Sequence, residues 1–434
     1  MSSLSESEKE DRRAQAVAKL AKLFGRNPDS KGGSGLDAET LVLEAILDAD
    51  DLEEAQRLAK KRLGALEKDR REKYKALCKE EEESIDAGAP ARSAGRLPAA
   101  LRAMHEGKYE SAAVREDYWD QGWAHGMQVL GGGSAPCPFE DRGGKIGGAE
   151  AAALAGDLAR MGFFTSAAVQ WGEDVSLRRI VAGMAELKSR GWPACFVFAY
   201  QEPWVLLDRL FVSVAALLST PDAPVSPDEL AIEPSVFGWL LDPPSGDVTR
   251  AGNNGFHLPH RDFSHPETFS PDGSLRVLSI WVPLTDVDAI NGCMFVLPKE
   301  FDPIHDKADD EWHLASAVPA AGRPGSLKVR FPLQGARPLP AQAGSVLGWH
   351  GNTIHWGGRC ASDAAHPRAS FACTFCRVEG GGEGTLEGNA LLSRAGLRAL
   401  TLRGRLSLVA HSLIMHKRWY PLDDSLVPPE FFAA

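Results

Sequence analysis

The apolar positions of the 434-residue chain follow two different periods. In roughly the first 86 residues they recur at steps of three and four among many Lys, Glu and Arg side chains, which predicts amphipathic helices. After about residue 230 the pattern changes to short β-branched and aromatic runs separated by Gly, Pro, Asn and Asp, which predicts strands joined by turns. Residues 87–148 are rich in Gly, Ala and Pro, and we interpret them as a linker and loop-rich segment.

We expect residues 1–86 to be a charged helical extension. Between Leu52 and Leu77 the apolar residues make only a narrow seam, as in a helical hairpin or a short coiled coil. A seam this narrow favours a solvated helix that lies on the rest of the protein. The alternative is an arm for self-association or for binding a protein partner.

Residues 149–434 predict a single domain in which helices precede and follow a strand-rich core. The segments that predict helices are residues 149–161, 174–189, 204–218 and 390–413. The segments whose aromatic and β-branched content predicts strands are residues 195–200, 235–241, 276–284, 293–297, 345–349, 353–356 and 368–378. Short strands at this spacing predict an antiparallel sandwich or barrel. Residues 301–341, rich in Asp, Pro, Gly and Arg, predict an insertion of the kind that often forms a lid or binds substrate.

The overall charge argues against some classes of function. With 59 acidic and 48 basic residues the formal net charge is −11, which disfavours a general binder of nucleic acid or of anionic membranes. No run approaches the length of about 18 apolar residues that a membrane span needs. The charged N-terminus, MSSLSESEKEDRR, lacks the apolar core of a secretory signal. We therefore expect a cytoplasmic protein.

The seven cysteines do not predict a disulfide framework. They are odd in number and scattered along the chain, which fits a reducing compartment. Cys373 and Cys376 make one CxxC motif, but no second pair accompanies it, and on a strand their side chains point to opposite faces. A zinc site is therefore not expected there.

The candidate chemistry centres on His260, Asp262 and His355. His260 and Asp262 are two residues apart, so both side chains point to the same face of a strand. A second His from another strand completes a set of two His and one carboxylate, the facial triad that holds non-haem Fe(II) and leaves coordination positions open. Arg368, shortly after His355, suits bidentate capture of a carboxylate. These residues predict an Fe(II) oxygenase that uses an acidic co-substrate.

Two further histidines compete for the ligand positions. His257 is five residues from Asp262, and His350 is five residues from His355, and an odd spacing puts two side chains on opposite faces of a regular strand. This parity favours His260 and His355. Other histidines fall in predicted loops, where we expect solvent-facing side chains: His265, His305, His313 and His366.

Four stretches around these residues resemble the phytanoyl-CoA dioxygenase family of Fe(II)/2-oxoglutarate oxygenases. They are HLPHRD at 257–262, IWVPLTDVDAINGCMFVLP at 280–298, GSVLGWHGNTIHWGG at 344–358 and RASF at 368–371. The resemblance covers roughly residues 150–380 and departs from the family pattern at Lys299-Glu300-Phe301, where the family usually has Gly-Ser-His. It implies an α+β fold with a double-stranded β-helix (jelly-roll, cupin-like) core flanked by helices, to which the N-terminal helical extension is added.

The resemblance also implies roles for individual residues. The iron ligands that it implies are His260, Asp262 and His355. It implies that Arg368 pairs with the distal carboxylate of 2-oxoglutarate, with Ser370 as a supporting hydroxyl on the same strand face. Trp281 matches the aromatic wall found near the co-substrate in this family, with core packing as the alternative. The implied cofactors are Fe(II) and 2-oxoglutarate, with ascorbate as an optional addition.

The expected reaction is hydroxylation of an unidentified small organic or acyl substrate, with release of succinate and CO₂. Relatives that halogenate have a small residue in place of the carboxylate ligand, so the presence of Asp262 favours hydroxylation. One alternative is a cupin-like metal enzyme that does not use 2-oxoglutarate and has no need of Arg368. Another is a non-catalytic scaffold that works through its N-terminal helices, in which the charges of the triad would be costly without a metal.

Overall fold

The computed structural model describes residues 119, 125–129, 139, 144–172, 175–189, 192–243, 259–307, 317–319, 327–329, 331–378, 385–386 and 389–415. The helical extension predicted for residues 1–86, and most of the predicted linker at 87–148, lie outside the described residues. An antiparallel hairpin of β6 (Ala317–Pro319) and β7 (Leu327–Val329) belongs to a separate unit. All the other described residues belong to one unit, which carries the candidate site.

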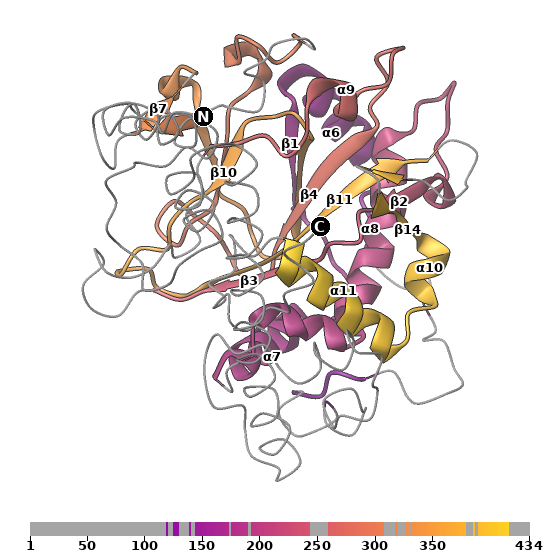
Figure 1. Cartoon of the computed structure of the whole chain (residues 1–434), viewed down its shortest axis with the longest axis vertical. Coiled ribbons are helices and arrows are strands. Elements are labelled where there is room, and N and C mark those ends of the chain that lie inside the picture. The colour runs from indigo at the N-terminus through magenta and orange to yellow at the C-terminus, as the bar shows by residue number, and fades with distance from the viewer. Residues whose placement is uncertain are drawn as a thin grey trace, which may run out of the picture. The chain divides into compact units, whose positions relative to one another are not determined.

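A seven-stranded antiparallel sheet forms the larger layer of this unit (Figure 1). Its strands are β1 (Phe163–Ala168), β2 (Leu230–Ile232), β3 (Phe237–Leu241), β4 (Val277–Pro283), β9 (Ser345–His350), β11 (Arg368–Arg377) and β14 (Leu392–Ser393). Their order is β1-β9-β4-β11-β2-β14, and β3 also pairs with β11. The long strand β11 therefore lies in the middle of the sheet, between β4 on one side and β2 and β3 on the other.

A three-stranded antiparallel sheet forms the second layer. Its strands are β5 (Met294–Val296), β8 (Arg337–Leu339) and β10 (His355–Gly357), in the order β10-β5-β8. One buried apolar cluster joins Trp281 and Leu347 of the larger sheet to Met294 and Leu339 of the smaller one. The two sheets thus share a core, as the two layers of a jelly roll do, and the predicted α+β jelly-roll fold is confirmed. A short hairpin of β12 (Thr385–Leu386) and β13 (Asn389–Ala390) follows.

Helices pack against the outer face of the larger sheet (Figure 1). The helices of this unit are α6 (Gly148–Met161), α7 (Leu177–Ser189), α8 (Glu202–Leu218), α9 (His265–Thr268), α10 (Arg394–Arg398) and α11 (Leu402–Met415). The 3-10 turns are η3 (Ala194–Ala199), η4 (Pro227–Glu229), η5 (Lys299–Phe301) and η6 (Leu333–Gly335). No helix in this described part of the chain has both the length and the apolar character to cross a membrane.

Side-chain alternation along β11 divides its residues between the helices and the smaller sheet. Phe371 contacts Phe198 of η3, and Phe375 contacts Phe211 of α8, with ring centroids 4.6 and 4.9 Å apart. The residues of opposite parity, Arg368 among them, therefore point toward the inside of the jelly roll, where Arg368 lines a cavity.

Most of the predicted elements are confirmed, with small shifts at their ends. The strands predicted after residue 230 match β3, β4, β5, β9, β10 and β11. The helices predicted at 149–161, 174–189 and 204–218 match α6, α7 and α8. The helix predicted at 390–413 is instead divided into β13, β14, α10 and α11. Six other short strands among the described residues were not predicted: β1, β2, β6, β7, β8 and β12.

The strand predicted at 195–200 is wrong. Residues 194–199 form the 3-10 turn η3 instead, and every side chain from position 195 to position 200 is buried. The turn packs between α7, α11 and β3. A short apolar run that is buried on every side has no alternation that distinguishes a strand from a helical turn, so its aromatic and β-branched content misled the prediction.

Gly348 of β9 tests how closely the strands and side chains of the larger sheet pack. A Cβ atom at this position would lie 2.4 Å from the Phe164 ring and 2.9 Å from the Ile280 side chain. We expect Gly348→Ala to lower the free energy of unfolding by roughly 1–3 kcal/mol, because overpacking forces buried neighbours to move. The measurement is urea denaturation followed by tryptophan fluorescence.

Gly156 of α6 gives the matched control, because a Cβ atom there meets nothing within 4 Å. Gly156→Ala should leave the free energy of unfolding unchanged or raise it by roughly 0.5–1 kcal/mol, since alanine favours a helix over glycine. Equal stability of Gly348→Ala and wild type would contradict the close packing of β1, β4 and β9.

Candidate metal and co-substrate site

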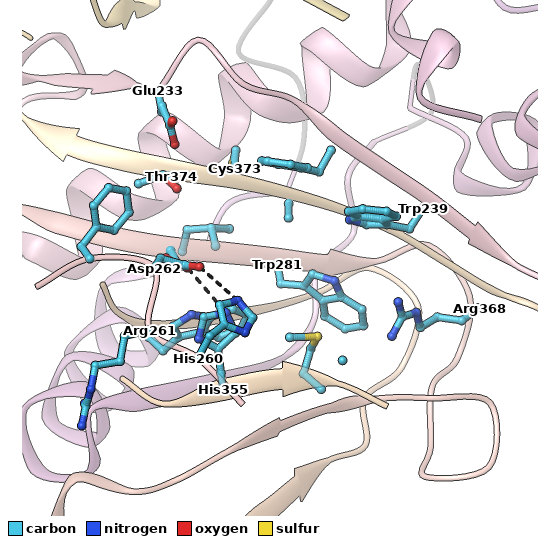
Figure 2. Close-up of a pocket in the computed structure, with 18 residues that line it drawn as sticks. Glu233, Trp239, His260, Arg261, Asp262, Trp281, His355, Arg368, Cys373 and Thr374 are labelled. Carbon is cyan, nitrogen blue, oxygen red and sulfur yellow. Dashed lines mark hydrogen bonds and ion pairs between the residues drawn. The ribbon is translucent and has the colours of Figure 1, made fainter. Parts of the chain in front are cut away.

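The structure brings His260, Asp262 and His355 together, as Figure 2 shows. His260 and His355 form an isolated antiparallel bridge, in which each backbone N–H donates to the other residue's carbonyl at 3.1 and 2.9 Å. The Nε2 atoms of the two imidazoles each lie 3.5 Å from one carboxylate oxygen of Asp262. In the part of the chain that the structure describes, this is the one group of three or more His, Cys, Asp or Glu residues arranged to hold a metal ion.

Neighbouring groups orient two of these three side chains. The Ser279 hydroxyl of β4 donates to Oδ2 of Asp262 at 2.8 Å. The Nδ1 atom of His355 lies 3.0 Å from the Thr353 carbonyl, which can only accept, so Nδ1 carries the proton and Nε2 keeps its lone pair. The ring of Trp349 lies against His355, with centroids 4.6 Å apart. Both His355 and Asp262 are thus held with metal-binding atoms directed toward a common point.

The charges of the triad suit a cation. Burial raises the pKa of the Asp262 carboxyl, but the charges and hydrogen bonds of His355, His260 and Ser279 together lower it by more, so the pKa lies well below its ordinary value. Burial lowers the pKa of His355 to about 4, against the opposing effect of Asp262. At neutral pH the site therefore presents one anionic carboxylate and a neutral imidazole at His355, the protonation states that metal ligation requires.

Arg368 lies at the start of β11 and is a buried cation, with 2% of its surface exposed. Its Nη1 atom donates to the carbonyls of Gly292 and Gly358 at 2.5 and 3.4 Å. Its Nε atom has no hydrogen-bond partner, and none of the described carboxylates pairs with it. Burial lowers the pKa of Arg368 to about 10, so the side chain stays charged at neutral pH. A buried charge without a counter-charge among the described residues is costly, and an anion bound in the cavity would offset that cost.

The backbone conformation at Gly292 allows its carbonyl to contact Arg368. Gly292 has a φ of 96°, and a Cβ atom there would lie 2.6 Å from the Gly358 carbonyl oxygen. The side-chain oxygen of Asn291 accepts a hydrogen bond from the Asp288 backbone N–H at 2.9 Å, which closes the turn that precedes Gly292. Glycine at position 292 thus allows two backbone carbonyls to converge on one guanidinium group.

Ser370 has the same parity as Arg368 on β11, and Trp281 of β4 lies near the Arg368 guanidinium group. Ser370, two residues along β11, is fully buried, and its hydroxyl has no partner among the described residues. The Trp281 ring of β4 lies 6.0 Å from the Arg368 guanidinium carbon. Trp281 also belongs to the core cluster between the sheets, so it both packs in the core and lines the site.

A cavity of about 300 Å³ connects these groups. Its lining includes the triad, Trp281 and Arg368, together with apolar side chains from both sheets. In the view of Figure 2, Trp281 lies between Asp262 and Arg368, and Glu233 and Thr374 lie above Asp262. The cavity thus extends from the triad past Trp281 to Arg368, and it also reaches Glu233 and Thr374.

The other histidines are placed as follows. His366 is exposed, as predicted, and His265 is partly exposed in α9. The prediction for His305 is wrong: it is 2% exposed, because it packs with Phe269 and His350 and its Nδ1 atom contacts Asp306 at 2.8 Å. His350 is buried outside the triad, and burial lowers its pKa to about 3. Two others lie outside the described residues: His257 and His313.

Sequence reasoning missed Ser279, the residue that hydrogen-bonds Asp262. The signal that could have identified it is parity, because Ser279 is two residues before Trp281 on β4 and shares its strand face. The Thr353 carbonyl, which orients His355, carries no signal in the sequence, since every residue has a backbone carbonyl.

A sequence comparison now bears on this geometry. Residues 247–370 match the model of the phytanoyl-CoA dioxygenase (PhyH) family. The match contains the triad and Arg368, and the family consists of non-haem iron enzymes, so the chain carries an Fe(II)- and 2-oxoglutarate-dependent enzyme domain. No curated protein matches the sequence.

Several solved structures are similar to this chain at low identity. The epimerase SnoN, in complex with Fe3+, alpha-ketoglutarate and nogalamycin RO, is 19% identical, with 56% of this chain and 96% of that chain covered and a TM-score of 0.34. The non-haem monooxygenase ThoJ is 17% identical, with 62% and 97% covered and a TM-score of 0.38. EvdO2 from Micromonospora carbonacea var. aurantiaca, complexed with 2-oxoglutarate, is 16% identical, with 52% and 90% covered and a TM-score of 0.30. Similarity at this level does not transfer a reaction or a substrate.

Four of the buried thiols in the unit that carries the site have raised pKa values. No metal-binding cluster among the described residues includes Cys373 or Cys376 of β11. Burial raises the pKa of Cys293 to about 11 and that of Cys376 to about 12. Burial also raises the pKa values of Cys360 and Cys373.

These thiols should stay protonated and unreactive in the folded protein. At about pH 8 an ordinary cysteine, with a pKa near 8.5, is partly thiolate, whereas a raised pKa keeps these four as thiols until the pH is much higher. We expect peptide mapping after iodoacetamide treatment to find them unmodified in native protein and modified after unfolding in guanidinium. Rapid native modification of Cys293 or Cys373 would contradict their burial.

Proposed function

We propose that the protein is a hydroxylase that acts on an unidentified small organic or acyl substrate, with Fe(II) held by His260, Asp262 and His355. In this proposal Arg368 and Ser370 hold the distal carboxylate of 2-oxoglutarate, and Trp281 forms a wall beside it. The observation that carries the proposal is that Arg368, a buried cation with no carboxylate partner among the described residues, lines the same cavity as the His-Asp-His group.

The donor set fits iron. Two imidazole nitrogens and one carboxylate make up the facial triad of non-haem Fe(II) oxygenases, and three ligands leave room for a co-substrate and oxygen. The Asp262 side chain is 29% exposed and that of His260 is 23% exposed, and both line the cavity. The ligand atoms therefore face the cavity, through which a metal ion and its other ligands can reach them.

The polar atoms around Arg368 fit a carboxylate. The Arg368 Nε atom and the Ser370 hydroxyl are both buried donors without a partner among the described residues, and unmet buried donors cost free energy. A carboxylate accepts from both at once, and it also balances the guanidinium charge. When bound, Fe(II) and 2-oxoglutarate supply the oxidising chemistry, in which 2-oxoglutarate and O₂ give succinate and CO₂ and a C–H bond of the substrate becomes C–OH.

The side chains of this protein orient the reactants and exclude water. Arg368 and Ser370 fix the far end of the co-substrate, and the buried ring of Trp281 beside them keeps that end dry. Ser279 holds Asp262, and the Thr353 carbonyl holds His355, so the ligands need little rearrangement. Asp262 occupies the position that halogenating relatives leave to a halide, which supports hydroxylation.

The alternative of a cupin-like enzyme without 2-oxoglutarate is less well supported. Such an enzyme does not need to bind a carboxylate at this position. Burial of the Arg368 charge, which has no counter-charge among the described residues, would then lower the stability of the fold without serving binding. The scaffold alternative is disfavoured by the same argument and by the triad geometry.

Succinate formation from 2-oxoglutarate tests the proposal directly. We expect wild type, supplied with Fe(II) and ascorbate, to form succinate slowly even without its substrate. Loss of a residue that only hydrogen-bonds a metal ligand typically lowers activity about 10- to 100-fold. Asp262→Ala should lower the rate of succinate formation by more than this, because it removes a ligand itself.

The control for altered charge is Arg337→Ala. The exposed Arg337 pairs with Glu300 at 3.2 Å and does not line the cavity, so this variant should form succinate at the wild-type rate. No succinate from wild type, or equal rates from wild type and Asp262→Ala, would argue against the proposal.

The role of Arg368 can be separated from that of the metal by varying the co-substrate. We expect Arg368→Ala to raise the KM for 2-oxoglutarate at least about tenfold, because a hydrogen bond to a charged group is worth about 1.5–3 kcal/mol. The variant should also lose the preference of wild type for 2-oxoglutarate over 2-oxobutyrate, which lacks the distal carboxylate. An unchanged ratio of the two KM values would show that Arg368 does not bind this group.

A further inference from the structure

Arg261 stands between two proposed iron ligands, His260 and Asp262, and its side chain is buried. Its guanidinium group forms a bidentate ion pair with Asp302, with Nη1 to Oδ2 at 2.5 Å and Nη2 to Oδ1 at 2.8 Å. Both side chains are completely shielded from solvent. The residue between the ligands is therefore fixed to the segment that follows η5.

The same guanidinium group also holds the segment that carries His355. Nη1 of Arg261 donates to the backbone carbonyl of Asn352 at 2.5 Å. The next carbonyl, that of Thr353, is the one that orients the His355 imidazole. One planar side chain thus links the His260–Asp262 segment to the backbone immediately before the third ligand.

A further contact closes this network. The Asn352 side-chain amide donates to the His305 carbonyl at 2.9 Å, and His305 is in the same segment as Asp302. Asp302 and Asn352 are both buried, at 7% and 0% exposed. Three stretches of chain are therefore joined at one point: the first carries His260 and Asp262, the second precedes His355, and the third contains Asp302.

We propose that Arg261 and Asp302 are positioning residues, whose ion pair sets the spacing between His355 and the two other metal ligands. This inference rests on the proposed iron-binding role of the triad. Arg261 suits the task because its planar fork donates to a carboxylate and a carbonyl in fixed directions. A lysine in its place keeps the charge but loses that geometry.

A buried ion pair can also stabilise a fold without affecting a nearby site, so the test needs a comparable pair elsewhere. Asp208 of α8 provides it, because it is 5% exposed and pairs with Arg394 and Arg398 at 2.8 and 2.7 Å. Asp208 does not line the cavity. Replacing either aspartate by asparagine keeps the side-chain shape and removes the negative charge that pairs with its arginine partners.

The experiment is a titration of metal-free protein with Co(II) alone. Calorimetry measures the affinity, and the visible absorption of the bound ion reports the geometry of the site. We expect Asp302→Asn and Arg261→Lys to bind Co(II) about 10- to 100-fold more weakly than wild type, with a changed absorption spectrum. Asp208→Asn should bind Co(II) with the wild-type affinity and spectrum. Thermal unfolding of each variant confirms that it is folded, and Arg261→Lys serves alone if Asp302→Asn does not fold.

The outcomes are distinct. Wild-type affinity and spectrum in folded Asp302→Asn and Arg261→Lys would overturn the positioning role and leave the metal site intact. Equal weakening in Asp208→Asn would also overturn it, because the effect would then be one of general stability. Failure of wild type to bind Co(II) would instead overturn the proposed metal site, and the inference with it.

Discussion

The pair of backbone hydrogen bonds between His260 and His355 is the interaction on which the site depends. It joins two segments that are far apart in the sequence, and it places one imidazole from each beside Asp262. Because these are main-chain bonds, they do not depend on the side chains that they position. The side chains are then adjusted individually, Asp262 by Ser279 and His355 by the Thr353 carbonyl.

The second constraint is the alternation of β11. One face of this central strand packs on η3 and α8 through Phe371 and Phe375, which fixes the rotation of the strand. Arg368 must then point inward, although a buried guanidinium group is costly. The carbonyls of Gly292 and Gly358 satisfy part of its hydrogen bonding and leave its charge unbalanced, which is the physical basis for assigning it an anionic ligand.

Much of this could be predicted from the sequence because strand parity is a local property. Parity selects His260 over His257 and His355 over His350, and it puts Arg368 and Ser370 on one face of a strand. What depends on packing between distant segments could not be predicted. The burial of His305, the contact of Ser279 with Asp262 and the ion pair of Arg261 with Asp302 all require the fold to be known. The 3-10 turn η3 was missed for the related reason that a fully buried apolar run shows no period.

We propose that one chain binds Fe(II) through the triad and 2-oxoglutarate beside it. The most direct measurement is the visible absorption of the protein with Fe(II) and 2-oxoglutarate under anaerobic conditions, where no turnover occurs. We expect an absorption band that requires both additions, that is absent from Asp262→Ala, and that needs more 2-oxoglutarate in Arg368→Ala. Absence of the band from wild type, with the protein folded and Fe(II) in excess, would contradict the account.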